Sequence, residues 1–151
     1  MEDLSEILRI GIRASISAKQ QMLDGSRIVD SLAKVVNKVV DVYGKDGKVL
    51  FCGNGVSAAD AQHLAAEFVS KLARDRDPLP ALALTVDSSM ITAIGNDYGY
   101  ENVFSRELEA VGKSEDILFL KLALLFSKKD ITPSLASSDA PLELIRLLSI
   151  I

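Results

Sequence analysis

The most constraining feature of the sequence is a short apolar run that leads through two glycines into a helical pattern. Residues 49–52 form the apolar run, Gly53 and Gly55 follow it, and the pattern predicts a helix from 57 to about 73. Glycine permits positive φ and close approach of the backbone to a ligand. This order predicts a βα unit of a parallel sheet, in which N–H groups at the start of the helix point at the turn.

The turn alone leaves two interpretations open. A helix N-terminus attracts phosphate, and ligands of open α/β sheets collect at the carboxyl ends of the strands. However, the turn matches neither the Walker A nor the G-x-G-x-x-G spacing, so a tight turn that binds nothing explains it equally well. Ser57 lies where we expect the N-cap of the helix.

The remaining chain alternates between helical and strand patterns. Helices are predicted over 3–23, from 26 to about 43, from a cap at Asp87 or Ser88, over 103–111 and over 142–151; strands over 48–52, 82–85 and from 116; and a loop over 95–99. This alternation predicts an α/β fold, a three-layer α/β/α sandwich with a parallel sheet, preceded by an N-terminal helical hairpin. We expect one domain over 1–151, with N-terminal helices over 1–44, an α/β part over 45–119 and a divergent or incomplete tail over 120–151.

Composition narrows the function classes. The net charge is −4 and the pI about 5.0, which disfavours nucleic-acid binding because that usually needs a basic face. Cys52 is the one cysteine, so no disulfide can form within the chain, and a reducing compartment is indicated. The longest apolar stretch, 117–126, is too short to cross a membrane, and the N-terminus shows no secretory signal. We therefore expect a cytoplasmic protein that binds no membrane.

Two polar groups could carry chemistry. His63 and Glu67 are four residues apart on the predicted helix, so both project from one face. Such a pair can supply two metal ligands, a base with its orienting partner, or only a surface hydrogen bond. Asn96 and Asp97 lie between glycines, where turn formation alone explains them.

Four stretches in order resemble one protein family. They are Cys52–Glu67, Leu79–Thr85, Thr92–Gly99 and Phe104–Gly112. Together with the two leading helices, they resemble the bacterial phosphoheptose isomerases, which are SIS (sugar isomerase) domain proteins. The resemblance covers residues 1 to about 119.

The resemblance implies an enzyme that converts sedoheptulose 7-phosphate to D-glycero-D-manno-heptose 7-phosphate in the synthesis of lipopolysaccharide core heptose. It implies a homotetramer joined through the N-terminal helices and an active-site zinc ion held in part by His63 and Glu67. Glu67 would also be the catalytic acid and base. The residues implied to contact the sugar phosphate are Asn54, Gly55, Val56, Ser57, Glu67, Asn96 and Asp97.

The sequence also departs from the family. Val56 replaces a glycine, and a valine resists positive φ. After the third strand the family has a Ser-Thr-Ser-Gly-Asn-Ser-type phosphate loop, and a later glutamine and histidine complete its zinc site; this chain has none of these. Residues 120–151 align with nothing in the family. An altered reading frame, omitted residues and a divergent natural SIS protein stay open as explanations.

Two other functions stay open beside the isomerase. One is a non-catalytic SIS protein that binds a replication initiator or another protein partner. The other is an incomplete domain without a function of its own. The pair His63 and Glu67 and the pair Asn96 and Asp97 favour the isomerase, because a scaffold does not need them.

Overall fold

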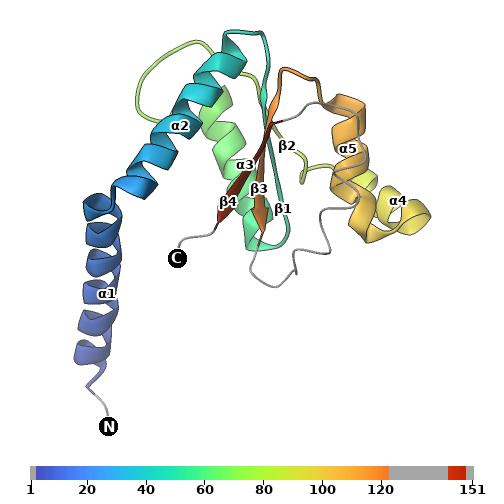
Figure 1. Ribbon diagram of the computed structural model, residues 1–151. Helices are drawn as coiled ribbons and strands as arrows, with labels where there is room; N and C mark the ends of the chain where they lie inside the picture. Colours follow the sequence, from blue (N-terminus) through green and yellow to red (C-terminus); the bar gives the residue numbers. More distant parts are fainter. Residues whose placement is uncertain (1–2, 123–142, 149–151) are drawn as a thin grey trace. The chain divides into compact units, whose positions relative to one another are not determined.

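The computed structural model describes residues 3–122 and 143–148, and it confirms the predicted α/β class (Figure 1). The elements are α1 (Leu4–Asp24), α2 (Ser26–Tyr43), β1 (Val49–Gly53), α3 (Val56–Val69), β2 (Ala81–Ala83), α4 (Ser88–Tyr98), the 3-10 helix η1 (Tyr100–Asn102), α5 (Val103–Val111), β3 (Ile117–Leu122) and β4 (Glu143–Leu148). Two compact units divide the chain, one up to Lys38 and one from Val39 onward. None of the helices in the described ranges is long and apolar enough to cross a membrane.

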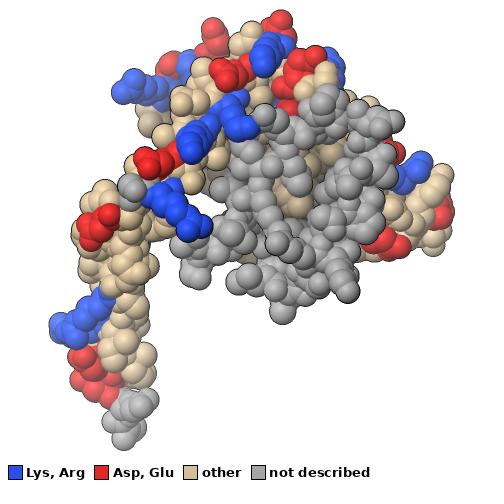
Figure 2. All heavy atoms as spheres, viewed as in Figure 1, with Lys and Arg blue, Asp and Glu red and all other residues tan. Residues whose placement is uncertain are grey.

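The first unit consists of α1 and most of α2, the two helices predicted ahead of the sheet. The Asp3 carboxylate accepts a hydrogen bond from the Ser5 N–H and caps α1. No residue of α1 is buried, and Figure 2 shows uncharged side chains over much of this helix. Large apolar side chains are exposed on both helices: Leu4, Ile7, Leu8, Ile10, Ile12, Ile16, Leu23, Val29, Leu32, Val36 and Val40. These residues form the apolar surface of α1 and α2.

The second unit is built on a parallel sheet with the strand order β2-β1-β3-β4. Phe51 of β1 is in register with Ala83 of β2 and with Phe119 of β3. All five residues of β1 are buried, which explains its unbroken apolar run, because parallel strands are covered on both faces.

Helices cover both faces of this sheet, so the predicted three-layer arrangement is confirmed. On one face Phe51 stacks on Phe119 with ring centroids 5.3 Å apart, and Phe68 of α3 lies 5.8 Å from Phe51. The other face packs against Leu108 of α5; its cluster is Leu50, Cys52, Leu84, Leu108, Leu118 and Leu120. Figure 1 shows α3 and α5 on opposite sides of the strands.

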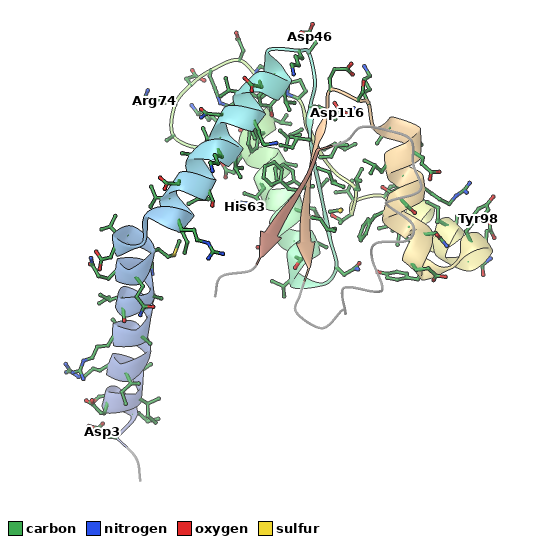
Figure 3. The ribbon with its side chains drawn as sticks, viewed as in Figure 1. Asp3, Asp46, His63, Arg74, Tyr98 and Asp116 are labelled. Atoms are coloured by element: carbon green, nitrogen blue, oxygen red, sulfur yellow. The ribbon has the colours of Figure 1, made fainter. Side chains whose placement is uncertain are left out.

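Asp116 joins the amino ends of β1 and β3. Its side chain is only 1% exposed, and its Oδ1 accepts a hydrogen bond of 2.8 Å from the Lys48 backbone N–H. Its Oδ2 accepts from the Lys113 N–H at 2.8 Å and pairs with the Lys48 ammonium at 2.5 Å. Figure 3 shows Asp116 at the start of β3. One carboxylate thus accepts hydrogen bonds from two backbone N–H groups and pairs with the partly buried Lys48 ammonium.

Three element predictions were wrong. Residues 95–98 continue α4 instead of forming a loop, because Gly95 weakens a helix without ending it and the positive φ of Gly99 supplies the end. Residues 143–148 form β4 instead of a helix; a short apolar run fits either, and pairing with β3 decides for the strand. The helix predicted to about 73 ends at Val69.

Candidate functional site

The turn between β1 and α3 depends on one glycine. Gly55 has φ 59° and ψ −126°, a conformation that residues with a Cβ adopt only with strain. An added Cβ would meet nothing within 4 Å, so the backbone conformation, not space, requires glycine here. The expected difficulty at Val56 does not arise. Val56 is the first residue of α3 and is 80% exposed, and Asp46 is the one non-glycine residue with positive φ in the described part of the chain.

The start of α3 differs from the predicted phosphate cradle. Ser57 is not the N-cap; Gly55 occupies that position, and Ser57 is a buried residue of the first turn. The N–H groups of Ser57 and Ala58 donate hydrogen bonds of 3.0 Å to the carbonyls of Asn54 and Gly55. Because these donors are already used inside the turn, fewer N–H groups face a ligand than the sequence indicated. Phosphate binding at this turn stays a prediction.

His63 and Glu67 come together on α3 as predicted. His63 Nε2 lies 3.6 Å from Glu67 Oε1, and the side chains are 74% and 28% exposed, respectively. Figure 3 places His63 on this helix. A metal ion could be shared by these two atoms, but no group of three or more His, Cys, Asp or Glu side chains suited to a metal exists among the described residues. The pair therefore fits two ligands of a zinc site and does not complete the usual three.

Arg76 supports the helix end that carries Glu67, a role missed at the sequence level. Its guanidinium donates hydrogen bonds of 2.8 Å to the backbone carbonyls of Glu67 and Phe68. The last carbonyls of a helix lack partners within the helix, so a cation there is favourable. Arg76 thus holds the charged segment 74–77 against the end of α3. An arginine shortly after a predicted helix end was the available signal.

The turn after β1 and the segment after α4 meet at one hydrogen bond. The Tyr100 hydroxyl donates to Asn54 Oδ1 at 2.8 Å. Asn96 and Asp97 lie on the last turn of α4, exposed, with Asn96 Nδ2 3.0 Å from Asp97 Oδ1. No hydrogen bond within the described residues joins this pair to His63 or Glu67. The structure thus joins the turn of Asn54 to Tyr100, and it shows His63 with Glu67 and Asn96 with Asp97 as two pairs, each held by its own contact.

Glu107 is a buried acid that sequence reasoning missed. It is 4% exposed, and its Oε1 has no hydrogen-bond partner in the described part of the molecule. Burial raises the pKa of Glu107, and the negative charge of Asp87 raises it further. Burial of the Cys52 thiol, and to a smaller extent the negative charge of Glu107, raises the pKa of Cys52 to about 12. An acid on the same helix face as Val103, Phe104, Leu108 and Val111 was the sequence signal.

Glu107→Gln is expected to stabilise the protein in a pH-dependent way. With a raised folded-state pKa, folding favours the protonated acid, so stability is full below the unfolded-state pKa and is lost as pH rises through the folded-state pKa. Glutamine stays neutral, so the free energy of unfolding should rise by about 1–2 kcal/mol at about pH 8 and change little at about pH 4. Urea denaturation at both pH values measures this.

The control is Glu109→Gln, which changes an exposed acid on the same helix. Its effect should stay below about 0.5 kcal/mol at both pH values. If Glu107→Gln changed the free energy of unfolding equally at the two pH values, the charge of Glu107 would not be what destabilises the protein at high pH.

Comparison with known proteins decides the family. The sequence matches the SIS domain over residues 17–121. It is 48% identical over 115 residues to a phosphoheptose isomerase of Clostridium acetobutylicum, covering 76% of this chain and 59% of that protein. It is 41% identical over 135 residues to one from Sulfurimonas denitrificans, covering 89% and 69%. The chain belongs to the phosphoheptose isomerase family of SIS domain proteins.

Solved structures of the family share this fold. Phosphoheptose isomerase from Neisseria gonorrhoeae superposes with a TM-score of 0.79 at 34% identity, over 95% of this chain and 74% of that one. The enzyme from Francisella tularensis gives a TM-score of 0.82 at 32% identity, over 97% and 75%. The chain spans 59% and 53% of the length of the first two curated relatives, which is between a half and six tenths.

Proposed function

We propose that this chain is a sugar-phosphate isomerase that converts sedoheptulose 7-phosphate to D-glycero-D-manno-heptose 7-phosphate, for lipopolysaccharide core heptose. The observation that carries the proposal is Glu67, a partly buried carboxylate beside His63 on the helix that follows the glycine turn. The identity of 48% and 41% to phosphoheptose isomerases supports the substrate class. Nothing in these comparisons favours the alternative of a scaffold that binds a replication initiator.

The reaction moves one proton between neighbouring carbons. A carboxylate at Glu67 takes the proton from C1 of the ketose and returns it to C2, while the hydroxyl proton of O1 is lost and O2 gains one. His63 lies within 3.6 Å and is suited to hold the Glu67 carboxylate in one orientation. Binding is assigned to the turn (Asn54, Gly55, Val56 and Ser57) and, for the sugar phosphate, to Asn96 and Asp97.

We also propose that His63 and Glu67 bind zinc. When bound, zinc would act as an electrophile on the oxygens of the substrate. The distance between the two ligand atoms suits a shared ion, but the described residues do not supply a third ligand, and the sequence has no later histidine or glutamine.

We propose that the chain assembles as a homotetramer in the cytoplasm. The support is the apolar surface of α1 and α2, whose large side chains are exposed within the described chain. Burying such side chains against another subunit is favourable by about 25 cal/mol per Å². The buried, unpaired Cys52 fits a reducing compartment. Sedimentation equilibrium of the purified chain measures the mass of the assembly; a monomer at high concentration would contradict this.

The test of the activity is turnover of sedoheptulose 7-phosphate by the full chain, with zinc and after removal of zinc by a chelator. We expect slow turnover, because the family's phosphate loop has no counterpart in the sequence. Product is measured by NMR, with uptake of solvent deuterium at the substrate carbons as the more sensitive signal. If both product and deuterium uptake are absent at high enzyme concentration, the proposed activity is overturned.

A further inference from the structure

The hydrogen bond between Tyr100 and Asn54 joins two segments that are far apart in the sequence. The residues are 46 positions apart, and the Tyr100 hydroxyl donates to Asn54 Oδ1 at 2.8 Å. Asn54 lies between β1 and α3, at the carboxyl edge of the sheet. Both residues remain exposed, so the bond lies where a ligand can reach it.

This hydrogen bond determines which side of the Asn54 amide faces outward. A side-chain amide has one accepting oxygen and one donating NH2 group, on opposite sides of the same carbon. With Oδ1 turned to the Tyr100 hydroxyl, the Nδ2 group is left to donate. Phosphate, hydroxyl and carbonyl oxygens of a sugar phosphate all need donors. We propose that Tyr100 is a positioning residue that turns the Asn54 amide so that its NH2 group meets a substrate oxygen, an inference that rests on the proposed function.

The local structure holds Tyr100 in place for this role. Gly99 has φ 92°, and an added Cβ there would lie 2.7 Å from the Glu101 carboxylate, so only glycine suits this sharp turn out of α4. The Tyr100 ring passes Gly95 of α4, where an added Cβ would lie 3.7 Å from Cδ2. The Asn102 side chain donates to the Tyr98 carbonyl at 2.6 Å and closes the segment.

This placement links the two predicted binding segments. Tyr100 follows directly on the helix turn that carries Asn96 and Asp97, and its hydroxyl reaches Asn54 at the other segment. Because a phenol on a short helical segment has few rotamers, the bond costs little conformational entropy. Tyr100 is therefore suited to hold the two segments in a fixed arrangement relative to each other.

Tyr98 supplies a matched control. It is 54% exposed, against 58% for Tyr100, and lies two residues earlier. Its ring faces the Arg106 guanidinium at 3.7 Å, and its hydroxyl has no hydrogen bond to Asn54. Tyr98→Phe thus removes the same atom from the same surface without affecting the Asn54 amide.

The first measurement does not depend on activity. In Tyr100→Phe, the side-chain NH2 resonances of Asn54 should shift and broaden in a 15N–1H NMR spectrum of the free protein. They should stay in place in Tyr98→Phe. Thermal unfolding verifies that both variants are folded. Asn54 resonances that are unchanged in Tyr100→Phe would overturn the positioning role.

The second measurement uses sedoheptulose 7-phosphate as the probe. Tyr100→Phe should weaken its binding by about five- to tenfold, the usual effect of one lost hydrogen bond, and Tyr98→Phe should not. In an Asn54→Ala background, Tyr100→Phe should have no further effect. A full effect in that background would show direct contact with substrate and overturn the proposal. If the Asn54 resonances shift but the wild-type chain binds no sugar phosphate, the proposed function fails, and presentation of the amide to substrate fails with it.

Discussion

Asp116→Ala is expected to lower the free energy of unfolding by about 3 kcal/mol or more. The Asp116 carboxylate is 1% exposed and accepts from two backbone N–H groups and the Lys48 ammonium. Alanine would leave all three donors without this partner at the start of β1 and β3. A polar group that is buried without a partner costs about 1–3 kcal/mol, which accounts for the size of the effect.

Urea denaturation of Asp116→Ala and of a neighbouring control measures this. Glu115→Ala changes an exposed side chain whose hydrogen bond is to Ser114, and should cost less than about 0.5 kcal/mol. Asp116→Asn should fall between the two, because its amide oxygen can still accept one backbone hydrogen bond. If Asp116→Ala and Glu115→Ala had the same free energy of unfolding, Asp116 would not be what joins the starts of β1 and β3.

Glu67→Gln is expected to lower the rate of isomerisation by about 10²–10⁴-fold, the range for a positioned acid–base group. Glutamine keeps the length of the side chain and a hydrogen-bonding partner for His63, but it cannot take a proton from carbon. Uptake of solvent deuterium into sedoheptulose 7-phosphate measures the transfer itself. The effect should appear in the rate at saturating substrate.

Asp75→Asn is the control for Glu67→Gln, because it removes a carboxylate that is 93% exposed in the loop after α3. Its rate should match the wild type. If Glu67→Gln kept the deuterium uptake of the wild type, Glu67 would not be the base, and the proton transfer would have to be assigned to another group.

Much of the fold could be predicted because local signals determined it. The apolar run of β1, the cap at Asp87 and the end of α5 before Gly112 each have a local cause, and each is confirmed. The errors arose where local signals are ambiguous. Residues 143–148 suit a helix or a strand, and only their partner β3 determines which one forms.

Less of the candidate site than of the fold could be predicted from the sequence. Spacing along one helix brings His63 and Glu67 together, so their contact could be predicted. The roles of Asn54, Asn96 and Asp97 came from family resemblance and stay predictions. Tyr100 and Glu107 were missed for different reasons. The hydrogen bond of Tyr100 spans 46 residues and exists only in the folded chain, whereas Glu107 is an exception on an apolar helix face.

The strand order also has a consequence for synthesis on the ribosome. β1 lies inside the sheet between β2 and β3, and it precedes the other described strands in the chain. Its start is 68 residues ahead of the start of β3. At roughly 5–20 residues per second, the ribosome needs about 3–14 s to make the intervening chain. Since β2 is made earlier and pairs with only one edge of β1, the other edge of this fully buried strand has no partner until β3 is made, and we expect nascent chains to aggregate first through that edge.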